Sequence, residues 1–144
     1  MEGIERFIEV QDSPYSGYTQ ALNEMENGGK CSHWIWYIFP QIAGLGRSGM
    51  AQRYALTDIE EAKAYLEHPI LGKRLYEITN VVLSYPEDEK PGFFMGSSID
   101  AIKLKSCMTL FDIISPNDIF GKVLDKFYSG ERDHKTIAIV QHSF

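Results

Sequence analysis

The segment from Lys30 to Gln41 gathers side chains that could bind a ligand or move a proton. They are Lys30, His33, Trp34, Trp36 and Gln41. An imidazole titrates near neutral pH and can act as a general acid or base, and an indole ring can stack on a flat ligand. If the segment is helical, a rotation of about 100° per residue puts most of its polar side chains on one face. The alternative is structural, since His33 and the indole N–H groups could simply satisfy buried backbone carbonyls.

A second polar group follows Ser97-Ser98 on a strongly periodic segment and consists of Asp100, Lys103 and Ser106. On a helix these side chains fall within one broad arc, so a carboxylate, an ammonium group and a hydroxyl could converge on one ligand. Lys103 lies among apolar neighbours, where a charge without a partner is costly to bury. We therefore predict His33 and Lys103 as candidate catalytic residues. The structural alternative for Lys103 is an i,i+3 ion pair with Asp100.

The stretch Gly44-Leu-Gly-Arg-Ser-Gly49 has the G-x-G-x-x-G spacing of dinucleotide-binding turns. Such a turn needs a preceding strand and a β-α-β unit, and Pro40-Gln41 interrupts the approach, so we predict no Rossmann site. Backbone amides at the start of a helix from Ser48, with Arg47 beside them, could instead hold a phosphate or a carboxylate. The alternative is a plain flexible connector.

Motifs of common enzyme classes are missing from the sequence. The four histidines show no metal-ligand spacing such as H-E-x-x-H, and neither cysteine belongs to a C-x-x-C pair. The sequence contains no G-x-S-x-G elbow and no Walker A motif. We therefore expect no metal and no cofactor, and we find no support for common hydrolase chemistry or P-loop phosphoryl transfer.

Hydrophobic periodicity and cap residues predict the helices that would position these groups. The predicted helical segments run from Ile4 to Gln11, from Ser13-Pro14 to Gly28, from Met50 to Leu56, from Thr57 to Leu66, from Pro69 to Val82 or Tyr85, from Ser98 to Ser115, from Asn117 to Gly130 and from Asp133 to Val140. Segment 98–115 is the predicted central helix. Two segments stay open, because 34–39 suits either a buried helix or a buried strand and 136–140 could be a strand.

Composition indicates one globular domain. The chain has 144 residues, of which 44% are hydrophobic and 24% charged, enough for a packed core. A formal charge of −6 and a pI near 5.2 oppose nucleic-acid binding, which depends on clustered Lys and Arg. No apolar run is long enough to span a membrane, and the first residues lack the features of a signal peptide. We therefore expect a soluble, cytoplasmic protein without membrane contact.

Several motifs together resemble domain-of-unknown-function family 1810. They are K-x-S-H-W-x-W-x-x-F-P-Q from Lys30, G-L-G-R-S from Gly44, M-A-Q-R-Y from Met50, A-Y-L-x-H-P-x-L-G from Ala64, and G-S-x-x-D-x-x-K-x-x-S-x-M-T-L-F from Gly96. The resemblance covers nearly the whole chain. It implies a single all-α domain over residues 1–144, with about seven or eight helices and with both open segments helical. The family is bacterial in type, and its function is not established. Some members are labelled calpastatin, but inhibitors of that type are long disordered chains, whereas this chain is short and rich in core residues.

Two functions from different classes fit these residues. The first is a small-molecule site for an anionic, nucleotide-like or ADP-ribose-like ligand, with hydrolysis or group transfer as the reaction class if the protein is an enzyme. His33 and Lys103 would then be catalytic, and the ligand-binding residues would be Lys30, Trp34, Trp36, Gln41, Arg47, Ser48, Asp100 and Ser106. The second is a non-catalytic protein-interaction or regulatory module, whose partner the sequence does not identify. A concave pocket lined by Lys103 and His33 would favour the first, and a flat exposed apolar patch the second.

Overall fold

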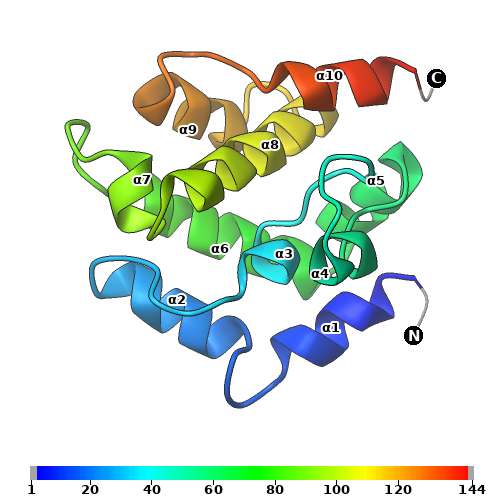
Figure 1. Ribbon diagram of the computed structural model, residues 1–144, viewed down its shortest axis with the longest axis horizontal. Helices are drawn as coiled ribbons and strands as arrows, with labels where there is room; N and C mark the ends of the chain where they lie inside the picture. Colours follow the sequence, from blue (N-terminus) through cyan, green and yellow to red (C-terminus); the bar gives the residue numbers. More distant parts are fainter. Residues whose placement is uncertain (1–2, 143–144) are drawn as a thin grey trace.

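The computed structural model describes residues 3–142, which form ten α-helices and no β-strand (Figure 1). The helices are α1 (Glu5–Gln11), α2 (Tyr18–Glu26), α3 (Ile35–Ile38), α4 (Gly49–Arg53), α5 (Ile59–Glu67), α6 (Leu71–Leu83), α7 (Pro91–Phe94), α8 (Ser98–Ile114), α9 (Ile119–Phe127) and α10 (His134–Gln141). Three of them, α3, α4 and α7, have only four or five residues. The structure thus has more helices than the predicted seven or eight, because the short helix α7 was not predicted and segment 34–39 was left open between helix and strand. No helix within residues 3–142 is long and apolar enough to cross a membrane.

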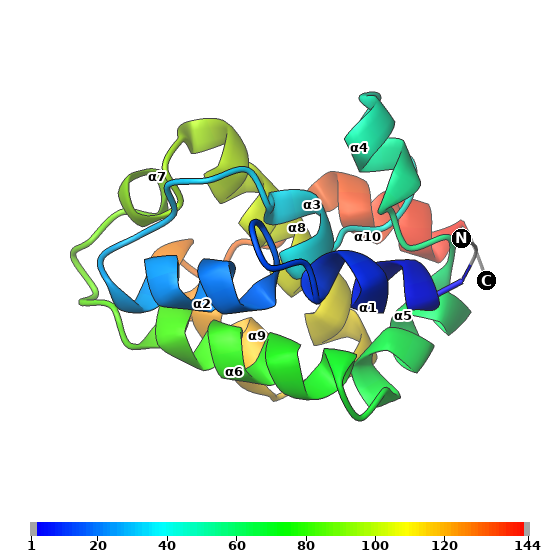
Figure 2. The same cartoon turned by 90° about the horizontal axis from the view of Figure 1, so that it is seen from below.

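Helix α8 lies at the centre of the molecule, as the sequence predicts. Figure 1 shows α9 and α10 on one side of α8 and α1 and α2 on the other. Helix α8 packs against α5, α7, α9 and α10, whereas α6 lies beside α2 and α9 (Figure 2). Leu104 and all residues from Ser106 to Phe111 are buried, so this part of α8 has no solvent-facing side. Its first turns are different, because Ile99 and Ile102 are exposed. The N-terminal end of α8 therefore has side chains that a ligand or a partner can reach.

Side-chain caps fix where several helices begin. Ser97 accepts a hydrogen bond from the amide of Asp100 (3.1 Å), and Asp133 accepts one from the amide of Thr136 (3.1 Å). The Asp133 cap agrees with the sequence prediction, and each of the two caps is worth about 1 kcal/mol of helix stability. Segment 136–140 is accordingly helical, as part of α10.

Two other caps lie one residue beyond their predicted positions. Asp58, not Thr57, caps α5 by accepting from the amide of Glu61, and Asp118, not Asn117, caps α9. Asn117 has a φ of 62°, a left-handed conformation that asparagine tolerates better than most residues. It therefore turns the chain before the helix instead of starting it.

The predicted start of the second helix at Ser13-Pro14 is wrong, because α2 begins at Tyr18. A Cβ atom on Gly17 would lie 2.2 Å from the carbonyl oxygen of Ser13 and 2.3 Å from that of Gln11. Only glycine fits such a close approach. The chain must therefore finish its turn at Gly17 before the new helix can start.

Segment 30–41 is mostly irregular, and only Ile35–Ile38 is helical. The common polar face predicted for a continuous helix therefore does not form. Trp34 and Phe39 at the two ends of α3 are fully buried, which anchors this single turn in the core. The residues before Trp34 form a surface loop between α2 and α3 that contacts the segment before α8 through Lys30 and Phe94.

Candidate functional site

Two lysines and one aspartate form an ion-pair cluster, here the Lys-Asp-Lys cluster, where the loop before α3 meets α8. The Nζ atom of Lys30 lies 2.7 Å from one carboxylate oxygen of Asp100, and the Nζ atom of Lys103 lies 3.8 Å from the other. Each ammonium group also lies over an indole ring. Lys30 is 5.2 Å from the ring centroid of Trp34, and Lys103 is 5.0 Å from that of Trp36. Since two ammonium groups share one carboxylate, the cluster carries one net positive charge.

The two lysines differ in their access to solvent. The side chain of Lys30 is 5% exposed and that of Asp100 is 16% exposed, whereas that of Lys103 is 26% exposed. Removing one partner of a buried pair leaves the other charge uncompensated, which is strongly destabilising. Lys30 and Asp100 are thus needed by the fold, and Lys103 is the more accessible positive charge.

Gly29 and Gly96 allow direct main-chain contact between the loop before α3 and the loop before α8. Gly29 has a φ of 148° and Gly96 a φ of 84°, conformations that L side chains rarely adopt. A Cβ atom on Gly29 would lie 2.8 Å from the carbonyl oxygen of Phe94, and one on Gly96 would lie 2.9 Å from that of Lys30. The amide of Lys30 donates a hydrogen bond to the Phe94 carbonyl (2.8 Å). This contact brings Lys30 to Asp100 across a long separation in sequence.

Glu24 on α2 holds the other side of the same loop. Its carboxylate accepts hydrogen bonds from the amides of Cys31 (2.7 Å) and Ser32 (2.9 Å), from the Ser32 hydroxyl (2.6 Å) and from the indole N–H of Trp34 (2.9 Å). Partial burial raises the pKa of Glu24, but these hydrogen bonds outweigh it and lower the pKa to about 2. Glu24 is therefore ionised at neutral pH and fixes the loop beside the Lys-Asp-Lys cluster.

A surface depression of about 270 Å³, here the α8 depression, opens beside the cluster at the N-terminal end of α8. Its lining residues are Lys30, Cys31, Ser32, His33, Met95, Gly96, Ser97, Ile99 and Asp100. The first amides of a helix have no carbonyl partner within it, and they carry the positive end of its dipole. The depression thus combines the Lys30–Asp100 ion pair, the Ser97 hydroxyl and the exposed imidazole of His33. Ammonium, hydroxyl and imidazole groups can bind phosphate and carboxylate oxygens, whereas the Asp100 carboxylate repels them.

The residues that the structure describes contain no arrangement of side chains suited to binding a metal ion. No group of three or more His, Cys, Asp or Glu side chains there could hold a metal ion. Cys31 and Cys107 are free thiols, the first exposed and the second buried. Burial raises the pKa of the Cys107 thiol well above its usual value, so this cysteine is an unreactive core residue.

Comparison with known proteins identifies the family. A family model described as "Protein of unknown function (DUF1810)" matches residues 1–140. The chain belongs to the DUF1810 family. It is also similar to a solved structure, the conserved hypothetical protein Rv1873 from Mycobacterium tuberculosis, with 38% sequence identity, a TM-score of 0.88 and 96% of each chain covered. No curated protein matches it. The all-α fold implied by the resemblance is thereby confirmed.

The structure of this DUF1810 chain brings half of the predicted site residues together. Lys30, His33 and Asp100 line the α8 depression, and Trp34 lies beneath Lys30. Lys103 belongs to the same cluster but faces Trp36 on the other side of Asp100. His33 and Lys103 therefore do not line the same pocket. Asp100 lies between them, because it lines the depression with His33 and pairs with Lys103.

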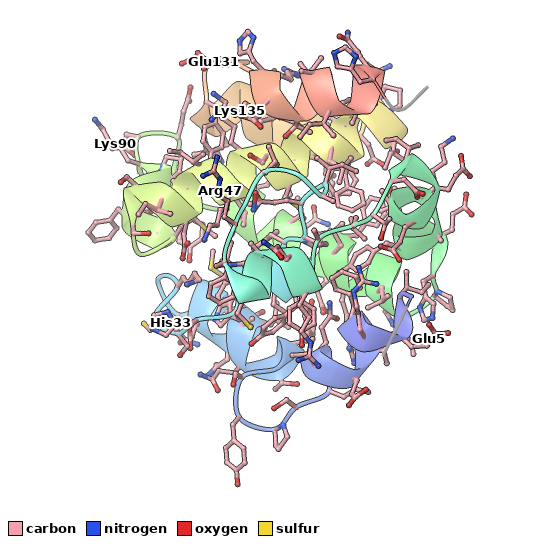
Figure 3. All side chains as sticks on the ribbon, turned by 45° about the vertical axis from the view of Figure 1, so that its right-hand side comes forward. Glu5, His33, Arg47, Lys90, Glu131 and Lys135 are labelled. Atoms are coloured by element: carbon pink, nitrogen blue, oxygen red, sulfur yellow. The ribbon has the colours of Figure 1, made fainter. Side chains whose placement is uncertain are left out.

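The remaining predicted residues lie elsewhere in the DUF1810 fold. Ser48 caps α4, where its Oγ accepts from the amide of Ala51 (3.1 Å), and Arg47 is exposed on the preceding loop, apart from His33 (Figure 3). Ser106 donates to Asp133 at the start of α10 (3.1 Å). Gln41 and Trp36 line a separate, smaller notch. The predicted convergence of all ten residues on one ligand is therefore wrong.

Sequence reasoning missed two residues that shape the depression. Ser97 was predicted only as a position before a helix, yet it lines the depression as well as capping α8. Glu24 gave no signal, because an acidic residue on a helix is ordinarily solvated. Its role depends on the fold of the loop from Cys31 to Trp34, which no local pattern specifies.

Proposed function

We propose that this DUF1810 protein binds a small anionic molecule in the α8 depression. The observation that carries the proposal is that the depression, which Lys30 lines, lies at the N-terminal end of the 17-residue helix α8, where the helix dipole is positive. A phosphate or carboxylate placed there would meet Lys30, the Ser97 hydroxyl and the first amides of α8. The Trp34 ring beneath Lys30 keeps its ammonium group in place for this contact.

The size of the depression limits which ligands can fit in it. Pockets for drug-sized molecules typically measure about 300–1,000 Å³, and the α8 depression, at about 270 Å³, is slightly smaller. It therefore suits the anionic part of a nucleotide-like or ADP-ribose-like molecule, with the rest of the ligand outside. The exposed side chain of Ile99 supplies an apolar wall against which a sugar or ring could pack.

Catalysis would depend on His33. Its imidazole lines the depression and is exposed, so it can exchange protons with solvent and with a bound ligand. In hydrolysis or group transfer it would serve as the acid or base. Lys103 would act only through charge, because it does not line the depression.

A second candidate function, a protein-interaction module, is favoured by the exposed apolar side chains beside the depression. Ile99 is 65% exposed and Ile102 is 60% exposed, and residues three positions apart lie on the same side of a helix. Phe93 on the neighbouring helix α7 is 75% exposed. These side chains would contribute to a partner interface, whereas the Lys-Asp-Lys cluster would then only brace the core.

Thermal unfolding with inorganic phosphate, AMP, ADP and ADP-ribose tests the proposal. A compound present at about 100 times its Kd adds about 2.7 kcal/mol of stability, which raises the unfolding midpoint of a domain of this size by several degrees. We expect at least one of these compounds to produce such a rise.

The matched variants are His33→Ala and His134→Ala, since both histidines are exposed but only His33 lines the depression. We expect the ligand-induced rise to shrink in His33→Ala and to persist in His134→Ala. An equal rise in both variants, or no rise for any compound with the wild type, would contradict the proposal and favour the interaction module.

A further inference from the structure

The side chain that caps helix α6 is a histidine, whereas the other side-chain caps within residues 3–142 are serines and aspartates. Those caps are Ser48, Asp58, Ser97, Asp118 and Asp133. At α6, the Nδ1 atom of His68 accepts hydrogen bonds from the amides of Ile70 (3.1 Å) and Leu71 (3.3 Å). Histidine is not among the residues that usually cap helices. Unlike serine or aspartate, it has no acceptor left once it gains a proton.

The main chain of His68 has the geometry of a helix cap. Its φ of −66° and ψ of 132° are extended, as the following Pro69 favours. The His68 carbonyl accepts from the amide of Gly72 (2.9 Å), so the helical hydrogen bonds begin here. Pro69 then stands at the first position, where its missing N–H group costs nothing. The next amides lack a carbonyl partner within the helix, and the imidazole satisfies them.

These hydrogen bonds define the protonation state of the His68 imidazole. The Nδ1 atom can accept only when it carries no proton, so the proton of the neutral ring is on Nε2. An ordinary histidine becomes protonated as the pH falls through about 6.5, and the imidazolium has two N–H donors and no acceptor. Its charge would also lie at the positive end of the α6 dipole. Acid therefore opposes this cap in two ways.

No carboxylate within the described part of the chain forms an ion pair with His68 to offset that charge. The charged residues nearest to it along α5 and α6, and those on the elements beside them, are Glu67, Lys73, Arg74, Asp12 and Asp112. Glu67 and Lys73 are exposed. Arg74 pairs with Asp12 and Asp112 pairs with Arg132. The cap therefore depends on a neutral imidazole.

The chain from Leu66 to Gly72, here the α5–α6 turn, is tightly packed. A Cβ atom on Gly72 would lie 2.0 Å from the carbonyl oxygen of Leu66, so α6 begins in main-chain contact with the end of α5. Further along α6, Arg74 donates to Asp12 at the end of α1 (2.9 Å). Release of the first turn of α6 would loosen both contacts.

We propose that His68 is a pH-sensitive cap and that protonation of its imidazole releases the first turn of α6 from the α5–α6 turn. At neutral pH the imidazole is uncharged and both hydrogen bonds form. As the pH falls through the range in which histidine gains its proton, both are lost, whereas the serine and aspartate caps keep their acceptors. The α5–α6 turn is therefore the part of the fold that responds to mild acid. This device does not depend on binding of an anion in the α8 depression.

NMR of the 15N-labelled full chain tests the cap. At about pH 7.5, long-range 1H–15N spectra should show the Nδ1 atom of His68 unprotonated and its Nε2 atom protonated. Between about pH 8 and pH 5, the amide signals of Ile70 and Leu71 should shift with the same midpoint as the His68 ring. Their protection from hydrogen exchange, corrected for the intrinsic rate, should fall about fivefold, the value of a typical cap.

Two substitutions separate this cap from general effects of acid. His68→Asn keeps an acceptor at the cap but does not titrate, so the pH response of the Ile70 and Leu71 amides should vanish. His134→Asn changes an exposed histidine on α10 and should leave the response as in the wild type. The proposal is overturned if Nδ1 carries the proton at about pH 7.5, if these amides do not follow the His68 titration, or if His68→Asn responds like the wild type. If His68→Asn does not fold, the first two measurements on the wild type decide.

Discussion

Asp100 is the residue on which both halves of the polar cluster depend. It faces the nearly buried Lys30 at 2.7 Å and the more accessible Lys103 at 3.8 Å. The i,i+3 pair with Lys103 follows from helical spacing and is found. The closer partner, Lys30, belongs to another loop, so only the tertiary structure reveals it.

Asp100→Asn should lower the free energy of unfolding by about 3 kcal/mol, because it leaves the Lys30 ammonium buried without a counter-charge. The double variant Lys30→Met/Asp100→Asn should recover most of this loss. Urea unfolding measures both. Glu131→Gln is the control, since it breaks an ion pair with Lys105 whose glutamate is 62% exposed and should cost less than about 1 kcal/mol. Equal losses in Asp100→Asn and Glu131→Gln would mean that the cluster is only a surface ion pair.

Glu24→Gln should lower the free energy of unfolding at pH 7 by about 2 kcal/mol, because its hydrogen bonds no longer go to a charge. The pKa of Glu24 falls from 4.5 to about 2 in the folded protein. Ionised Glu24 thus stabilises the fold above pH 4.5, and this contribution is lost as the pH falls toward 2.

Urea unfolding over that pH range should therefore show a steeper loss of stability in the wild type than in Glu24→Gln. Glu26→Gln, an exposed change on the same helix, should keep the wild-type slope. Identical slopes for the wild type and Glu24→Gln would show that the carboxylate is not specially stabilised in the folded state.

At the scale of elements, the site depends on loops more than on helices. Gly29 and Gly96 allow the contact between the loops before α3 and α8, whereas α8 contributes its N-terminal end. Helix periodicity predicted α8 and its start correctly because its apolar residues recur regularly and Ser97 can cap it. It gave no information about segment 30–34, whose conformation is set by Glu24 and by the contact with Phe94.

Ser106 was predicted to lie beside Asp100 and Lys103, and helix geometry explains why it does not. Six residues at about 100° each rotate a side chain about 120° away from Asp100 around the helix axis. Ser106 therefore meets Asp133 of α10 instead of the Lys-Asp-Lys cluster. Helical spacing was sufficient to predict that Asp100 and Lys103 pair. Placing Ser106 on the same helix was not sufficient to predict which neighbour its side chain contacts.

Two glycine substitutions test the loop contact. Gly96→Ala should destabilise the protein by more than about 1 kcal/mol, because alanine is strained at a φ of 84° and its Cβ would press on the Lys30 carbonyl. Gly49→Ala should stabilise it by about 0.4–1 kcal/mol, since nothing lies within 4 Å of the added Cβ and the residue begins α4. Thermal unfolding compares the two. A Gly96→Ala protein as stable as the wild type would show that the two loops are not tightly joined.

At the scale of the whole molecule, long-range contacts hold the helices around α8. Arg6 on α1 is largely buried and forms an ion pair with Glu61 of α5 (3.0 Å). Its guanidinium also donates to the carbonyls of Arg53 (2.9 Å) and Ala55 (2.6 Å). One side chain thus joins α1, α5 and the segment after α4. These contacts unite parts of the chain that sequence periodicity predicts only separately.

The net charge of the molecule and the charge of its site have opposite signs. The chain carries −6, and the ionised Glu24 offsets the single positive charge of the Lys-Asp-Lys cluster, so the local positive charge at the site comes mainly from the start of α8. Charges further apart than about 10 Å are largely screened at 0.1 M salt. An anion in the α8 depression would therefore respond mainly to the local positive charge, which makes anion binding compatible with an acidic protein.

The most direct measurement of the central claim is a 1H–15N NMR titration of the full chain with ADP-ribose, and separately with inorganic phosphate. Binding in the α8 depression should produce saturable shifts of the backbone amides of residues 31–33 and 97–100, with little change in α9 and α10. Shifts confined to other helices, or no shifts with either compound at millimolar concentration, would contradict an anion site at the α8 depression.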